Sequence, residues 1–279
     1  MPSQTTVKAF APANVNLTLH VSGRRTDGYH VLDSLVAFAD VGDTLGVHYA
    51  HEMGLTVSGD MADGVPEDAT NLVWKAAQLF APKRPVRIYL EKALPVAAGI
   101  GGGSSDAAAI LRALARLEDR PWPDSAAALG ADIPVCLRPR AQRMSGIGDI
   151  LDPVALPPLA AVLVNPGVEV PTQAVFRGLQ AADNPAMDDH LPDWDSPEAA
   201  IDWIAQQRND LEPPARALAP EIDEVLDELR LAPACSLARM SGSGATCFGL
   251  FPDMATARAA ASVLAAQHPL WWVVPTLLS

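Results

Sequence analysis

Basic residues are scarce in this chain. Lysine and arginine together number 20 against 33 aspartates and glutamates, which gives the 279 residues a formal net charge of −13. A nucleic-acid backbone or an anionic membrane surface attracts proteins with a basic surface, so we exclude both as the main partner. A nucleotide is still compatible with this charge, because backbone N–H groups and a few local cations suffice to bind phosphate.

Cysteine and long apolar runs are also lacking. The three cysteines, Cys136, Cys235 and Cys247, have neither CxxC spacing nor a cluster of histidines beside them, which argues against a zinc site and a disulfide framework. The first residues, MPSQTTVKAFAP, have no basic segment ahead of an apolar run, and no stretch of about 18 apolar residues follows. We therefore expect a cytoplasmic protein, a monomer or weak homodimer, whose 49% hydrophobic content builds a packed core.

The most informative stretch is PVAAGIGGGSSDAAAILRAL, residues 95–114. Its glycines lead into a helix pattern, where they would let an anion approach unpaired N–H groups at the positive end of the helix dipole. A tight turn capped by Ser104, Ser105 and Asp106 would explain the same composition without a ligand. A Walker A loop and the GxGxxG fingerprint are both excluded, because the residue after Gly103 is Ser104.

Strand and helix patterns occur in both halves of the chain, which predicts an α+β fold. A change of character near residue 155 divides the chain into expected domains at 1–155 and 156–279. Residues 181–200 are acidic and rich in proline, and they predict an exposed, poorly structured connection. Residues 7–20 predict a strand, a short interruption and a second strand. The other expected strands are 31–39, 43–49, 54–57, 86–90, 159–164, 246–251 and 271–275, and the expected helices follow Asn71 and Gly103 and cover 196–207, 220–230 and 255–267.

Three sequence blocks resemble those of the GHMP kinases, the superfamily of galactokinase, homoserine kinase, mevalonate kinase and phosphomevalonate kinase. The central block is the glycine stretch, and the last is MSGSGAT at 240–246, which in that family packs against the phosphate loop. The first, PANVNL at 12–17 with GRRTDGYH at 23–30, looks like the branch that phosphorylates 4-diphosphocytidyl-2-C-methyl-D-erythritol in the non-mevalonate route to isoprenoids. LGADIP at 129–134, Pro171-Thr172 with Phe176, and NDLE at 209–212 match that branch in order and spacing.

The resemblance covers essentially the whole chain and implies a two-lobed GHMP-kinase-like fold, with nucleotide and substrate sites in the cleft between the lobes. It implies a small-molecule partner, a cytidine-diphospho sugar alcohol, and the cofactors ATP and Mg²⁺, whose protein ligands stay unassigned. The positions that match the ATP phosphate loop are Pro95, Ala98, Gly99, Gly101, Gly102, Gly103, Ser104 and Ser105.

The same resemblance assigns the reacting groups. Asp132 matches the aspartate that accepts the proton of the attacking hydroxyl; the alternative is a cap for the turn before Pro134. Lys92 either adds positive charge beside the nucleotide or is a solvated lysine at a strand end. The substrate positions are Asn16 and Thr172 as polar contacts, Tyr29 and Phe176 as aromatics on either side of the cytosine ring, and His30 as the reader of its edge.

One position departs from the family pattern. Between Ala13 and Val15 the family ordinarily has a lysine paired with the catalytic aspartate, and this chain has Asn14. Without that charge, the transition state loses on the order of 3 kcal/mol, or ~100-fold in rate; Lys8 is the nearest upstream lysine. The sequence predicts an ATP-dependent kinase, with two alternatives: a kinase for another alcohol such as mevalonate or homoserine, and a nucleotide-binding protein that has lost catalysis.

Overall fold

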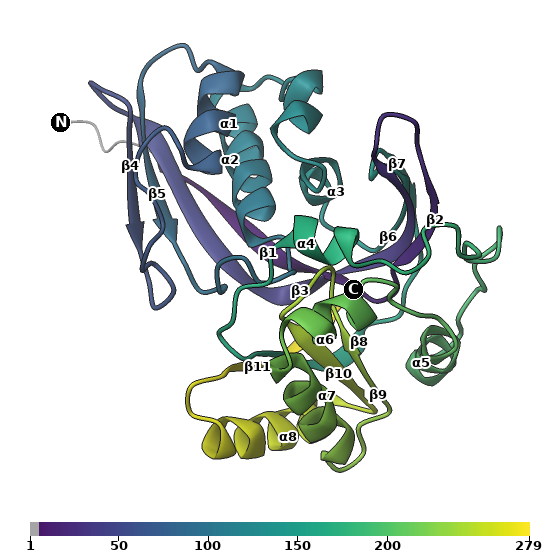
Figure 1. Cartoon of the computed structure of the whole chain (residues 1–279). Helices are drawn as coiled ribbons and strands as arrows, with labels where there is room; N and C mark the ends of the chain where they lie inside the picture. The colour runs from purple at the N-terminus through teal and green to yellow at the C-terminus, as the bar shows by residue number, and fades with distance from the viewer. Residues whose placement is uncertain (1–5) are drawn as a thin grey trace. The chain divides into compact units, whose positions relative to one another are not determined.

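The computed structural model describes residues 6–279 and is drawn in Figure 1. Its described part forms two compact units built from interleaved segments. The first unit comprises the described residues up to Ala13, together with Val41–Val96 and Gly101–Pro139. The second takes Asn14–Asp40, Ala97–Ile100 and Arg140–Ser279. The units therefore do not follow a single cut of the chain, and the division expected at residue 155 stays a prediction.

The first unit is a sheet with helices packed beside it. Strand β5 pairs in parallel with β4 and antiparallel with residues 44–49 of β3, and β1 also pairs with β3. Helices α1 and α2 pack against each other, and α3 packs on α2 (Figure 1). The elements are β1 (Val7–Asn16), β3 (His30–Tyr49), β4 (Gly54–Ser58), β5 (Val86–Glu91), α1 (Leu72–Phe80), α2 (Gly102–Glu118), the 3₁₀ turn η1 (Asp124–Leu129) and α3 (Ile133–Leu137).

Two local features explain why the helices of this unit begin and pack as they do. The Asn71 side chain accepts a hydrogen bond from the N–H of Val73 at 2.8 Å, so it caps α1 as the sequence predicts. The start of α2 is dominated by alanine, and Ala107, Ala108 and Ala109 are fully buried. Short side chains let this helix approach its neighbours closely, so its first turns, where the predicted phosphate loop ends, are held by the core.

The second unit contains two groups of strands. In one, β11, β8, β10 and β9 lie in that order and pair antiparallel, with α7 and α8 packed on them (Figure 1). In the other, the first half of β3 pairs with β2 and β6, and β6 pairs with β7. The elements are β2 (His20–Arg24), β6 (Gln142–Gly146), β7 (Ile150–Pro153), β8 (Leu159–Asn165), β9 (Leu237–Met240), β10 (Cys247–Phe251), β11 (Trp272–Leu278), α4 (Thr172–Arg177), α5 (Pro197–Ala205), α6 (Glu212–Leu218), α7 (Glu221–Leu231) and α8 (Met254–Gln267).

The observed elements confirm most of the expected ones and differ at two places. The runs expected at 31–39 and 43–49 form one strand, β3. At Gly42, between the two runs, a Cβ would come within 2.3 Å of the Ala11 carbonyl oxygen. Glycine at this position lets β1 and β3 stay paired without a break. The connection at 181–200 has no regular structure before α5, yet its first part is held by many hydrogen bonds. Across residues 6–279, no helix is both long and apolar enough to cross a membrane.

Candidate functional site

The first turn of α2, in the first unit, has the geometry that the sequence predicts for a phosphate site. Gly101 stands at the N-cap in the left-handed region, with φ 58°, and no side chain caps the helix. The N–H of Ser105 donates to the Gly101 carbonyl at 2.8 Å, so the N–H groups of Gly102–Ser104 have no acceptor within the helix. The first turn carries no acidic residue. Backbone donors and the positive end of a 17-residue helix therefore face the same space.

The loop before this turn packs against the third sequence block in the second unit. Gly99 has φ +70°, and a Cβ there would lie 2.6 Å from the Gly244 carbonyl oxygen and 2.7 Å from that of Ser241. Only glycine fits this position. The Ser241 hydroxyl donates to the Gly99 carbonyl at 3.0 Å, and the Thr246 N–H donates to the Ala98 carbonyl at 3.1 Å. The packing of this block against the loop, which the resemblance implied, is confirmed.

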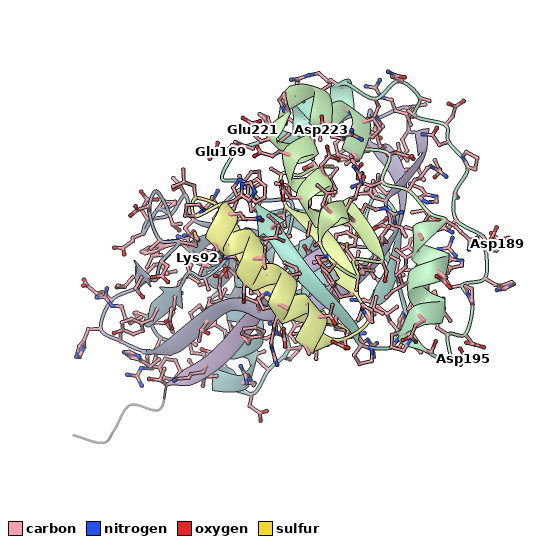
Figure 2. The ribbon with its side chains drawn as sticks, turned by 90° about the horizontal axis from the view of Figure 1, so that it is seen from below. Lys92, Glu169, Asp189, Asp195, Glu221 and Asp223 are labelled. Carbon is pink, nitrogen blue, oxygen red and sulfur yellow. The ribbon has the colours of Figure 1, made fainter. Side chains whose placement is uncertain are left out.

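Lys92, labelled in Figure 2, is buried beside the phosphate loop. Its ammonium donates to Asp106 at 2.9 Å and also to Asp43, and its side chain is 4% exposed. The expectation of a solvated lysine is therefore wrong, because two carboxyl groups of the first unit draw the side chain inward. Burial raises the pKa of Asp106 to about 8 despite the charge of Lys92. With Asp106 protonated at neutral pH, one ammonium faces one carboxylate behind the loop.

Two further polar atoms at the start of α2 are buried. Asp106 Oδ1 and the Ser105 hydroxyl have no hydrogen-bond partner among the described residues. Neither was predicted as a buried group, because both read as capping residues in the sequence. The Ser105 hydroxyl belongs to the set of oxygen donors at the loop that could serve a hard cation or a phosphate.

Asp132 stands at the N-cap of α3 but does not cap it. Its side chain makes no capping hydrogen bond, so the capping alternative is wrong. Arg112 of α2 holds the helix by donating to the Cys136 carbonyl and, at 2.6 Å, to the Phe10 carbonyl. Burial raises the pKa of the Asp132 carboxyl. The Asp132 carboxyl is therefore not used to cap α3, which agrees with the prediction that it is a reacting group.

The cytosine-recognition positions lie in the second unit. Tyr29 follows the turn between β2 and β3 and is 62% exposed. The His30 ring stacks on Phe176 of α4, with centroids 4.8 Å apart and planes 25° from parallel. Burial, together with the charge of Arg24, lowers the pKa of His30. The structure therefore brings the rings of His30 and Phe176 into contact. Tyr29 precedes His30 in the sequence, and its side chain is exposed.

The polar positions are tied to the third block. The backbone N–H of Asn16 donates to the Ser241 hydroxyl at 3.0 Å, and its side-chain amide donates to Ser34 at 2.8 Å. Thr172 shares a 2.8 Å hydrogen bond with Ser243. Asn14 is buried, and its N–H donates to the Ile100 carbonyl at 3.1 Å. Pro95, the first residue of the predicted ATP phosphate loop, lies in the first unit.

Sequence reasoning did not assign a role to Asn209, although it noted the NDLE motif. The Asn209 amide donates to the Met240 carbonyl at 2.8 Å and the Gly242 carbonyl at 2.9 Å. It thereby holds the turn of the third block. The match of that motif in order and spacing was the available signal, but its partner lies about 30 residues away and could not be identified.

Comparison with known proteins places this constellation in a family. The pattern described as GHMP kinases N terminal domain matches residues 71–151, and that described as GHMP kinases C terminal matches residues 184–270. A relative from Dinoroseobacter shibae, named 4-diphosphocytidyl-2-C-methyl-D-erythritol kinase, is 60% identical over 99% of this chain and 96% of its own length. This chain belongs to the GHMP kinase family.

Other GHMP kinases support the fold and the branch. A relative of the same name from Cereibacter sphaeroides is 55% identical over 98% of this chain and 99% of its own length. The crystal structure of a 4-(cytidine 5'-diphospho)-2C-methyl-D-erythritol kinase shares 36% identity and a TM-score of 0.77, covering 98% of this chain and 99% of that one. A mevalonate kinase from L. major, in complex with R-mevalonate, has a TM-score of 0.70 at 15% identity, covering 99% and 97% of the two chains. It shows the shared fold alone.

Membership in the GHMP kinase family implies ATP as the phosphoryl donor, and the phosphate loop fits it. A Cβ at Gly102 or Gly103 would meet no atom nearer than 3.7 Å. The first turn thus has space as well as backbone donors. The described residues hold no cluster of three or more His, Cys, Asp or Glu side chains that could bind a metal.

Proposed function

We propose that this GHMP kinase transfers the γ-phosphoryl group of ATP to the 2-hydroxyl of 4-diphosphocytidyl-2-C-methyl-D-erythritol. The observation that carries the proposal is the 60% identity, over 99% of the chain, to a relative with that name. The open first turn of α2 and the stacked pair of His30 and Phe176 support it, since the reaction needs a phosphate site and a site for a flat base.

The phosphate loop binds and orients the donor. The N–H groups of Gly102–Ser104 donate to phosphate oxygens, and the α2 dipole favours their charge. Mg²⁺, when bound, neutralises charge on the phosphates. It needs few protein ligands because it keeps several waters in its coordination shell. The hydroxyls of Ser104 and Ser105 are the donors that this chain offers to it.

Asp132 acts as the base in the transfer. The acceptor hydroxyl oxygen attacks the γ-phosphorus, its proton passes to the Asp132 carboxylate, and the bond to the bridging oxygen breaks to release ADP. A pKa raised by burial brings the carboxyl closer to the operating pH, which makes it a better proton acceptor when ionised. Asn14 provides an uncharged donor where the family has a lysine, so the developing charge is less stabilised here.

The second unit recognises the cytidine. Because its pKa is lowered, His30 is neutral at pH 7, and one of its ring nitrogens can accept a hydrogen bond from the exocyclic amine of cytosine. The base stacks beside the ring pair of His30 and Phe176, with Tyr29 on its other side. Asn16 and Thr172 provide polar contacts to the rest of the substrate.

The cellular setting follows from the chemistry. No disulfide joins the three cysteines, all of which lie in the described part of the chain, and this suits a reducing cytoplasm. We expect the protein to work there as a monomer or a weak homodimer.

Steady-state ATP turnover tests the proposal and the role of Asn14 together. The cytidine substrate, mevalonate and homoserine are each offered to the native chain and to the Asn14→Lys variant under identical Mg²⁺. Turnover with the cytidine substrate alone, raised in the variant, is the expected result. Turnover with mevalonate or homoserine instead would contradict the substrate assignment. ATP binding without turnover in either chain would favour a nucleotide-binding protein that has lost catalysis.

A further inference from the structure

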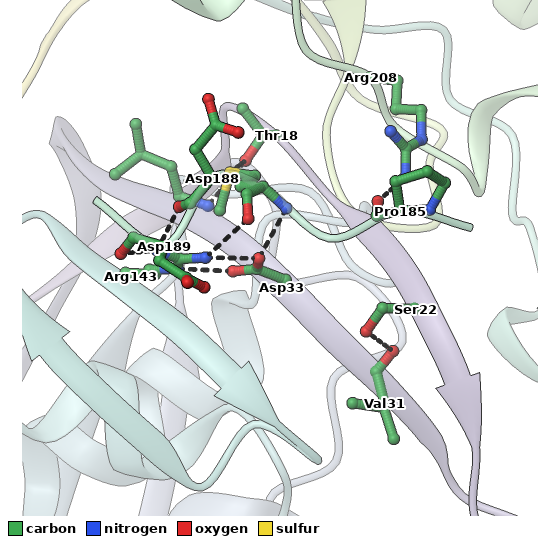
Figure 3. Close-up of polar contacts among 11 residues, drawn as sticks. Thr18, Ser22, Val31, Asp33, Arg143, Pro185, Asp188, Asp189 and Arg208 are labelled. Carbon is green, nitrogen blue, oxygen red and sulfur yellow. Dashed lines mark hydrogen bonds and ion pairs between the residues drawn. The ribbon is translucent and has the colours of Figure 1, made fainter. Parts of the chain in front are cut away.

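A short strap, defined as residues 184–189, covers part of the second unit within the acidic connection (Figure 3). The Asn184 N–H donates to the Val21 carbonyl at 3.2 Å, and the Met187 N–H donates to the Asp33 carboxylate at 2.9 Å. Met187 is buried, and the Thr18 hydroxyl contacts its sulfur at 3.2 Å. The strap is therefore attached along its length to the strands beneath it.

Arg143 of β6 is the centre of this attachment. Its guanidinium binds the Asp33 carboxylate through two bonds, Nε to Oδ1 at 2.8 Å and Nη2 to Oδ2 at 2.7 Å. Nη1 donates to the carbonyls of Asp188 at 2.8 Å and Asp189 at 2.9 Å. Asp33 is 3% exposed. The planar fork of arginine serves a carboxylate and the strap carbonyls at once, which the single ammonium of a lysine cannot reproduce.

The hydrogen bonds of this attachment come from the backbone of the acidic segment. The charge of Asp189 adds to them, since the pKa of Arg143 is raised first by its hydrogen bonds to Asp33 and further by the charges of Asp33 and Asp189. Asp188 and Asp189 contribute backbone carbonyls, and their carboxylates are exposed. Figure 2 shows Asp189 and Asp195 at the surface of this segment. The acidic composition that predicts disorder is thus compatible with a strap held through its backbone.

The strap holds the base of the hairpin formed by β2 and β3. Val21 lies on β2 and pairs with Leu32, while Asp33 lies on β3 and pairs with His20. Val21 and Asp33, the two residues that bind the strap, therefore belong to neighbouring residue pairs of the β2–β3 ladder. The Asp210 carboxylate adds a third anchor by accepting from the Val21 N–H at 2.7 Å.

The tip of this hairpin carries Tyr29 and His30. Within the tip, Arg25 and Asp27 form an exposed ion pair. The Arg25 N–H donates to the Tyr29 carbonyl at 2.8 Å, the Gly28 N–H to the Arg25 carbonyl at 3.0 Å, and the Tyr29 N–H to the Asp27 carboxylate at 3.2 Å. Outside the tip, the His30 ring stacks on Phe176. Exposed ion pairs add little rigidity. The direction in which the tip presents its two rings therefore depends on how firmly the base of the hairpin is held.

The strap acts from the face of β3 opposite to His30. Successive strand residues point to alternate faces, so His30, Leu32 and Ser34 share one face and Asp33 points to the other. Ser34 accepts from Asn16, another predicted substrate contact, on the His30 face. The strap can thus hold the hairpin without occupying the space of the base.

We propose that Arg143 and Asp33 are positioning residues for cytidine recognition, since they lock the strap onto the hairpin and fix Tyr29 and His30. This inference rests on the proposed function. It adds two residues that touch no substrate but set the affinity for one of the two substrates.

Two measurements on the full chain test the inference with Arg143→Ala. Hydrogen exchange reports the mobility of residues 20–31, with α8 as the internal reference. Kinetics give KM for the cytidine substrate and for ATP. We expect faster exchange in the hairpin, a KM for the cytidine substrate raised about 10-fold or more, and kcat and the KM for ATP within about 3-fold. Arg143→Lys should recover part of the lost affinity, because it keeps the charge beside Asp33.

Two further variants keep the test decisive. Arg230→Ala removes another arginine paired with an aspartate, Asp227 on α7, and should leave both measurements unchanged. If Arg143→Ala does not fold, Met187→Ala loosens the strap while keeping the ion pair, and the same rise in KM is expected.

Three results would overturn the inference. These are unchanged exchange in residues 20–31, faster exchange with an unchanged KM for the cytidine substrate, and equal weakening of both substrates. Failure of the proposed function is recognised separately, because the native chain itself would then show no turnover with the cytidine substrate.

Discussion

Gly99 and Gly64 form a natural pair for measuring how tightly the phosphate loop is packed. Both have a left-handed backbone, with φ +70° and +75°. A Cβ at Gly99 would lie 2.6 Å from the Gly244 carbonyl oxygen, whereas one at Gly64 would meet nothing within 4 Å. Gly64→Ala therefore has only the conformational cost, about 1–2 kcal/mol in the free energy of unfolding.

Gly99→Ala adds a steric cost to the same conformational one. Forcing extra volume into a packed site costs about 1–3 kcal/mol, and shifting the loop weakens the 3.0 Å bond from the Ser241 hydroxyl, worth about 1 kcal/mol. We expect a total loss of about 3–6 kcal/mol. Urea unfolding of the two variants and the native chain gives the three free energies. Equal losses in the two variants would refute the close packing of the loop against the third block.

Three further predictions concern the chemistry. Phe176→Ala should raise the KM for the cytidine substrate while the KM for ATP stays constant, because of the two substrates only the cytidine would stack on this ring; a parallel rise in both would contradict the stacking. The pH profile of kcat/KM should lose activity toward acid at a pH above the ordinary pKa of aspartate, because burial raises the pKa of Asp132. Asn14→Lys should move that limb to lower pH, because in the family a lysine at this position is paired with the catalytic aspartate and a paired cation lowers a carboxyl pKa. If the acid side of the pH profile does not move, the residue at position 14 does not act on the pKa of Asp132. The free energy of unfolding should fall as pH rises from about 4 toward about 8, because folded Asp106, with a pKa of about 8, holds a proton that the unfolded chain releases. Asp106→Asn should flatten this dependence on pH. An unchanged slope in that variant would show that another group causes it.

The sequence could predict elements whose signals are local. The cap at Asn71 depends on neighbours within a few residues and appears as expected. Glycine at positions 99 and 101 likewise marks backbone conformations that other residues rarely adopt. The alternation expected from Val15 to His20 does not appear, because β1 ends at Asn16 and Thr18 and His20 are buried as well as Leu17 and Leu19.

The sequence could not predict contacts that only the tertiary structure creates. Lys92 reads as a surface lysine until the fold brings Asp43, 49 residues away, against its ammonium. The strap has a composition typical of disorder, and its order comes from Arg143, about 40 residues earlier in the chain. Side-chain charge gave no hint, since the strap binds Arg143 through backbone carbonyls.

Analysis of the product tests the central claim most directly. The native chain is incubated with ATP, Mg²⁺ and 4-diphosphocytidyl-2-C-methyl-D-erythritol, and phosphorus NMR identifies where the new phosphate is attached. We predict one equivalent of ADP and a phosphate monoester on the 2-hydroxyl, and neither with Asp132→Asn beyond a trace. A phosphate on another hydroxyl, or ADP formed without any phosphorylated cytidine product, would contradict the account.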